Sequence, residues 1–125
     1  MDILVTNNPL VEAQSWNGLQ VEYLQAHLID VLIQVRDHVH KGRCLLTHPL
    51  SGSVKPNETP YKSILVSEER GITDEQSVRI IEECLSTVRG FPSKHIPEHY
   101  LSDLRTVDLS LITTALELRM DKMYN

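Results

Sequence analysis

The pattern of hydrophobic and polar positions changes period several times along the chain, and each period predicts an element. Residues 3–6 form a β-rich apolar run that ends at two asparagines and a proline, which indicates a buried strand followed by a turn. Residues 19–24 alternate apolar and polar side chains, as a half-buried strand does. Two further apolar runs, at 43–47 and 63–67, predict a third and a fourth strand.

Longer segments follow the period of a helix. Apolar residues over 28–41 recur on one helical face, and the segment ends in a lysine and a glycine, as helices commonly do. Residues 73–90 begin with the spacing of a capping box and end at a glycine, which predicts a second helix. From Pro97 onwards a helical rhythm of apolar residues continues toward the C-terminus and predicts either one long helix or two short helices broken near Thr106.

These elements predict a single α/β domain over residues 1–125. Strand, helix and strand across 19–47 make a βαβ unit, whose strands run parallel and whose crossover is right-handed. We expect a layered domain with about four mostly parallel strands and with helices on both faces of the sheet. A chain of 125 residues buries roughly two-thirds of its unfolded surface, so its core needs neither a disulfide nor a metal.

The segment between the third and fourth predicted strands has no helical or strand period and contains three prolines, one glycine and two lysines. Such loops often carry function, and ligands of α/β sheets bind beyond the carboxyl ends of the strands. Its small residues and lysine suit a nest for a carboxylate or phosphate. We therefore predict a ligand site formed by the turn at 7–9 and the loop at 48–62. The predicted site residues are Asn7, Asn8, His48, Ser51, Gly52, Ser53, Lys55, Asn57, Tyr61 and Lys62.

A rigid connector that binds nothing is the alternative explanation of this loop, since prolines restrict the unfolded chain and Ser, Asn and Thr side chains bond their own backbone in turns. His48 is the candidate for acid–base chemistry, because an imidazole beside a cleft can transfer protons near neutral pH. Histidines in such places often only bond to backbone. The sequence contains neither a nucleophile elbow nor the residue order of a Ser-His-Asp triad.

Histidine and cysteine spacing predicts no metal site and no cofactor. His38 and His40 lie two positions apart on a helix and so point in different directions, and Pro97 interrupts the spacing of His95 and His99. Two isolated cysteines lie inside apolar runs, without CxxC spacing, and are predicted to be buried, reduced thiols. They are Cys44 and Cys84.

The charge balance and the N-terminal composition exclude several classes of protein. The chain has 17 acidic and 12 basic residues and a formal charge of −5, opposite in sign to the basic surface of a nucleic-acid-binding protein. Residues 1–10 lack the basic start and the length of a signal peptide. No segment approaches the ~20 apolar residues that a membrane span needs. We expect a cytoplasmic protein that binds neither nucleic acid nor membrane.

Three stretches of the chain resemble the GrdX family, small proteins encoded with the glycine reductase genes of amino-acid-fermenting anaerobes. They are VTNNPLV at 5–11, VRDHVHKGRCLLTHPLSGSVKPNETPYKSI at 35–64, and D-x-x-S-x-x-I-I at 74–81. The resemblance covers most of the chain. It implies a cytoplasmic protein associated with glycine, sarcosine or betaine reductase, and it assigns no reaction and no catalytic residue.

Three hypotheses about function remain. The first is a non-catalytic accessory or regulatory protein that binds a small anionic ligand or a reductase component through the loops at 7–9 and 48–62. The second is a small enzyme with His48 as acid or base and Lys55 as anion anchor. The third is a structural homodimer without a ligand, in which the apolar C-terminal helix forms the interface.

Overall fold

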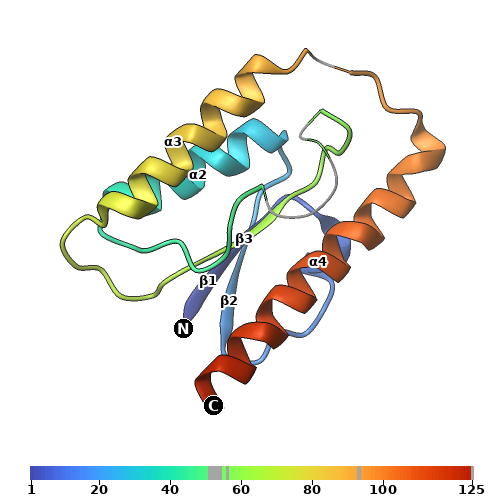
Figure 1. Cartoon of the computed structure of the whole chain (residues 1–125). Helices are drawn as coiled ribbons and strands as arrows, with labels where there is room; N and C mark the ends of the chain where they lie inside the picture. Colours follow the sequence, from blue (N-terminus) through green and yellow to red (C-terminus); the bar gives the residue numbers. More distant parts are fainter. Residues whose placement is uncertain (51–54, 56, 93, 125) are drawn as a thin grey trace.

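The computed structural model of the chain describes residues 1–50, 55, 57–92 and 94–124. It contains a three-stranded sheet with helices on both faces (Figure 1). The strands are β1 (Asp2–Thr6), β2 (Leu19–Tyr23) and β3 (Ser63–Val66), in the order β2-β1-β3. The α/β class and the helices on both faces agree with the sequence, whereas the four mostly parallel strands do not. β2 is parallel to β1, but β3 is antiparallel to it.

The direction of β3 follows from the connection that precedes it. A parallel neighbour requires a crossover of a dozen or more residues, usually a helix, to bring the chain back to the starting edge. The described part of the segment at 48–62 contains no helix, so the chain turns round and re-enters the sheet in the opposite direction. The sequence already indicated the reversal of direction, because the segment between the apolar runs at 43–47 and 63–67 has no helical period.

The predicted third strand at 43–47 is an extended segment and not a full strand. It runs antiparallel to β3 through one isolated bridge, from Leu45 to Val66. Side chains take over hydrogen bonds that a continuous ladder would make between backbone groups. The hydroxyl oxygens of Ser67, Ser77 and Thr47 accept the backbone N–H groups of Cys44, Leu45 and Leu65, respectively, at 2.8, 3.0 and 3.0 Å. The segment runs parallel to β2, as predicted for the βαβ unit. It does not pair with β2, because β1 and β3 lie between them.

Two helices cover one face of the sheet and pack on each other, α2 (Leu28–His40) and α3 (Glu75–Gly90). The apolar face of α2 predicted from the sequence is buried there, and Ile3 and Val5 of β1 point toward it. This core consists of Ile3, Val5, Val31, Leu32, Val35, Val39, Ile64, Val66, Ile81 and Leu85.

The other face is covered by α1 (Pro9–Glu12) and the long α4 (Glu98–Tyr124). Alternation along β1 and β3 sends Leu4 and Leu65 to this side, where they meet Val11 of α1 and Ile112 of α4. In the part of the chain that the structure describes, no helix is both long enough and apolar enough to span a bilayer.

Candidate functional site

Asn7 joins three segments at the end of the sheet where β1 ends and β3 begins. Its Nδ2 donates to the carbonyl oxygens of Ala26 and Pro60, at 3.0 and 2.7 Å, and its Oδ1 accepts the backbone N–H of Lys62 at 2.9 Å. The residue is 5% exposed. The turn at 7–9 and the loop at 48–62 therefore meet, as the sequence predicted, and Asn7 connects them.

Asn8 is fully buried and connects the same turn to α4. Its Oδ1 caps α1 by accepting the N–H of Leu10, and its Nδ2 donates to the carbonyl of Arg105 and to Oδ2 of Asp108. An amide side chain offers two N–H donors and one oxygen acceptor, and all three groups are used inside the protein.

A chain of hydrogen bonds continues from Asn8 through the sheet to α4. The N–H of Asn8 donates to Thr6 Oγ1, which lies 2.7 Å from Ser63 Oγ, and the Ser63 hydroxyl donates to Asp108 Oδ2 at 2.8 Å. Because a serine has one proton and Ser63 gives it to Asp108, the Thr6 hydroxyl is the donor to Ser63. The Asp108 carboxylate, 4% exposed, thus accepts two hydrogen bonds. Sequence reasoning missed this buried acid, although it stands out as a charge within the apolar rhythm of the C-terminal helix.

Lys62 lies beside this cluster. Burial lowers the pKa of its ammonium group below the usual 10.5, and the nearby Asp108 carboxylate partly opposes the shift. Both side chains line two narrow cavities of about 10 Å³ each, room for roughly one water molecule. These spaces are too small for the ligand that the sequence predicted.

Two further predicted residues lie beside these small cavities, because Tyr61 lines one and His48 the other, each together with Lys62. His48 is exposed, and its Nδ1 accepts the N–H of Leu50 at 3.1 Å, the backbone bond that the sequence analysis gave as the alternative to proton transfer. Lys55 is exposed, and the Tyr61 hydroxyl accepts a hydrogen bond from Arg105 Nε at 2.8 Å. The predicted Ser51, Gly52 and Ser53 lie outside the described residues.

A much larger cavity, of about 620 Å³, opens beside Asn57 at the start of α2. We call it the α2 cavity. Its walls come from four segments: the first turn of α2, the end of α3, residues 57–60 of the predicted loop, and the connection between α3 and α4. Its lining residues are His27, Leu28, Ile29, Asn57, Thr59, Pro60, Val88, Arg89, Phe91, Pro92, Lys94 and Ile96.

The α2 cavity has a positive electrostatic character. Its described lining residues include the basic side chains of His27, Arg89 and Lys94 and no acidic side chain. The first-turn amides of Leu28 and Ile29 have no acceptor within the helix and form the positive end of its dipole. The carboxylate of Asp30, which accepts the N–H of His27 at 3.1 Å, partly offsets this positive end. α3 brings its negative end to the same cavity, where Arg89 in its last turn offsets it.

Lys94 also borders a second cavity, of about 420 Å³, between the α3–α4 connection and the start of α4. Its Nζ lies 3.7 Å from Oε1 of Glu58, which lines this second cavity and is not among the lining residues of the α2 cavity. Both side chains are about half exposed, so the pair contributes little to stability.

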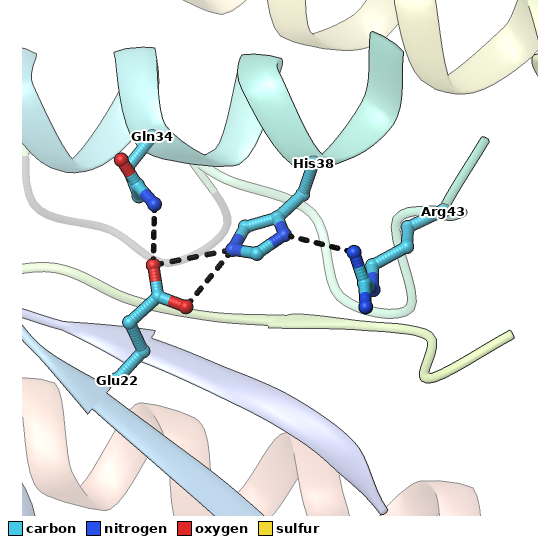
Figure 2. Close-up of polar contacts among 4 residues, drawn as sticks. All are labelled: Glu22, Gln34, His38 and Arg43. Carbon is cyan, nitrogen blue, oxygen red and sulfur yellow. Dashed lines mark hydrogen bonds and ion pairs between the residues drawn. The ribbon is translucent and has the colours of Figure 1, made fainter. Parts of the chain in front are cut away.

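A separate polar cluster lies between α2 and the edge strand β2 (Figure 2). Glu22 accepts hydrogen bonds from Gln34 Nε2 at 2.6 Å and from His38 Nε2 at 3.0 and 3.2 Å. Arg43 Nη1 lies 3.5 Å from the other ring nitrogen, Nδ1. Since a guanidinium can only donate, Nδ1 accepts and Nε2 carries the proton. The cluster fixes α2 against β2, and the i, i+4 spacing of Gln34 and His38 was the sequence signal for it.

The two thiols differ. Cys84 is buried, as predicted, and burial raises the pKa of its thiol to about 11. Cys44 is only partly buried. Among the described residues, no three His, Cys, Asp or Glu side chains are grouped to hold a metal ion.

Comparison with known proteins identifies the family. No curated protein and no solved structure matches the chain. The model of the GrdX-like protein family matches residues 3–117, which include all of β1 but its first residue, β2, β3, the first three helices and most of α4. The chain therefore belongs to the GrdX-like protein family, as its sequence stretches indicated, and this membership links it to the gene context of glycine reductase.

Proposed function

We propose that the protein is a non-catalytic accessory or regulatory protein of glycine, sarcosine or betaine reductase that binds a small anionic ligand in the α2 cavity. The observation that carries this proposal is the cavity's lining, which combines a volume of about 620 Å³ with basic side chains and, among its described residues, no acid. Cavities of this size hold whole small molecules.

Both segments predicted from the sequence have a part in this site. Asn57, Thr59 and Pro60 of the loop at 48–62 form one wall of the cavity. Asn7 does not line it, but its amide bonds the carbonyls of Ala26, next to the wall residue His27, and of Pro60. Asn7 is thus a positioning residue that holds two walls at a fixed separation.

The lining favours binding over catalysis. Its described residues include one imidazole, that of His27, and no carboxylate or thiol with which it could form an acid–base or nucleophilic pair. His48, the catalytic candidate from the sequence, is not among them. An accessory role also involves contact with a reductase component, which co-purification of the two proteins tests directly.

Thermal melting with phosphate, acetyl phosphate, acetate, glycine and betaine tests the binding site. A ligand at ~100 times its dissociation constant adds about 2.7 kcal/mol to the free energy of unfolding. We expect a shift with at least one anion that is lost in Lys94→Gln and Arg89→Gln. Lys41→Gln, an exposed lysine at the opposite end of α2, is the matched control.

Two outcomes contradict the proposal. If no anion shifts the melting temperature, the cavity is not an anion site. If the shift survives in both cavity variants but disappears in Lys55→Gln, the ligand binds at the loop, as the sequence first suggested, and not in the α2 cavity.

A further inference from the structure

The floor of the α2 cavity is apolar. Ile29 and Val88 are partly buried and pack against the core between the sheet and the two helices, and Leu28 is 8% exposed. Phe91 and Ile96 continue this apolar surface along the α3–α4 connection. A hydrated ion such as phosphate gains nothing from such a surface, because apolar surface favours apolar partners.

The basic groups lie at the rim. His27, Arg89 and Lys94 are exposed, whereas Ile29, Val88 and Ile96 are half-buried. Of the apolar residues, Phe91 is also exposed, at 37%. The cavity thus separates charge at its mouth from apolar surface at its base. It has the form of a site for a molecule with one charged end and one apolar end.

We infer that the ligand of the α2 cavity is an amphipathic anion, a carboxylate or phosphate joined to an aliphatic or aromatic group. This inference rests on the proposed function and adds the chemical class of the ligand. The anionic group meets the basic rim and the first-turn amides of α2. The apolar group covers the floor and removes it from water, and each methylene buried in this way contributes about 0.8 kcal/mol, roughly a fourfold change in affinity.

A homologous series of ligands separates the two ends of the site. Isothermal titration of the full chain with acetate, butyrate, hexanoate and octanoate measures how the dissociation constant changes with chain length. We expect it to fall about three- to fourfold per methylene until the floor is covered. Phenyl phosphate is likewise expected to bind more tightly than inorganic phosphate.

Variants assign the two contributions to residues. Phe91→Ser and Ile96→Ser lower the gain per methylene, because they remove apolar surface from the cavity, and they weaken octanoate binding by a larger factor than acetate binding. Lys94→Gln weakens every member of the series by the same factor. Ile72→Ser, at a 98% exposed position outside both cavities, is the control and changes neither quantity.

The outcomes distinguish this inference from the proposed function. Equal affinity along the carboxylate series overturns the amphipathic ligand but leaves anion binding intact. Hexanol binding as tightly as hexanoate overturns both, because the charge then contributes nothing. Absence of binding by every member of both series also overturns both.

Discussion

Replacing Asp108 with alanine tests whether the buried polar chain holds the sheet edge to α4. The carboxylate accepts hydrogen bonds from Ser63 Oγ and Asn8 Nδ2 at 2.8 and 3.0 Å, and the residue is 4% exposed. Alanine removes the acceptor of both donors. The hydroxyls of Thr6 and Ser63, 2.7 Å apart, then have two protons but only one hydrogen bond between them, so one proton loses its acceptor. Asn8 keeps its second bond, to the carbonyl of Arg105.

The magnitude follows from these two donors. A buried donor left without a partner costs about 1–3 kcal/mol, so two give roughly 2–6 kcal/mol. The wild-type carboxylate is itself desolvated, and relief of that cost offsets part of the loss. We therefore expect Asp108→Ala to lower the free energy of unfolding by about 2–4 kcal/mol, a large share of the ~5–15 kcal/mol of an ordinary domain.

Urea denaturation followed by circular dichroism measures the change. Asp108→Asn keeps an oxygen acceptor in the same place and is expected to lose less than half as much as alanine. Asp103→Ala, an exposed aspartate on the same helix, is the control and should stay within about 0.5 kcal/mol of the wild type. A loss below about 1 kcal/mol for Asp108→Ala, or an equal loss for both substitutions of Asp108, would refute the hydrogen-bonding account.

Three other predictions concern the backbone, a thiol and the rim of the α2 cavity. Gly42→Ala should lower the free energy of unfolding, measured by urea denaturation, by about 2 kcal/mol or more, because φ is +95° and a Cβ would clash with the backbone oxygen of Gly71. Gly18→Ala should cost less, because φ is +76° but the space around the Cβ is open. At pH 8, iodoacetamide should modify Cys84 at least roughly 100 times more slowly than free cysteine, as measured by mass spectrometry. The reason is that a pKa of about 11 leaves only a small fraction of the thiol as the reactive thiolate. Because this pKa is raised from 9.0, the stabilisation from the neutral thiol is complete below pH 9 and is lost between pH 9 and 11; rapid alkylation at pH 8 would contradict the burial. Glu58→Gln should tighten phosphate binding about two- to fivefold in titration calorimetry by releasing Lys94 from its ion pair, and a weakening would show that Glu58 assists the ligand.

Much of the fold was predictable because its signals are local. The apolar stripes of α2 and α3 and the alternation of β2 each depend on residues a few positions apart. The capping-box spacing predicted Thr73 as the N-cap of α3, but Asp74 caps the helix instead, by accepting the N–H of Ser77. These patterns predicted the α/β class and the placement of helices on both faces. The predictions of mostly parallel strands and of a full strand at 43–47 were wrong, because the direction and pairing of a segment depend on connections and on distant side chains such as Ser77.

The candidate site was predictable only in part. The sequence correctly expected the turn at 7–9 to meet the loop at 48–62, and Asn57 does line the α2 cavity. It did not indicate His27, Arg89 or Lys94, which lie on different elements and share no motif. Their side chains line one cavity only because α2 begins where α3 ends.

Hydrophobic period and turn residues are encoded over a few neighbouring positions, so the sequence alone was enough to predict α2, α3, a helical C-terminal region, the three strands of the sheet and the helices on both faces. Tertiary structure decided the sheet order, the burial of Asp108 and the shape of the α2 cavity. The physical reason is how far apart the interacting residues lie in the sequence. The apolar face of a helix can be buried against any apolar surface. The hydrogen bond from Asn8 to Asp108, in contrast, joins residues 100 positions apart and forms only when the sheet and α4 have packed together.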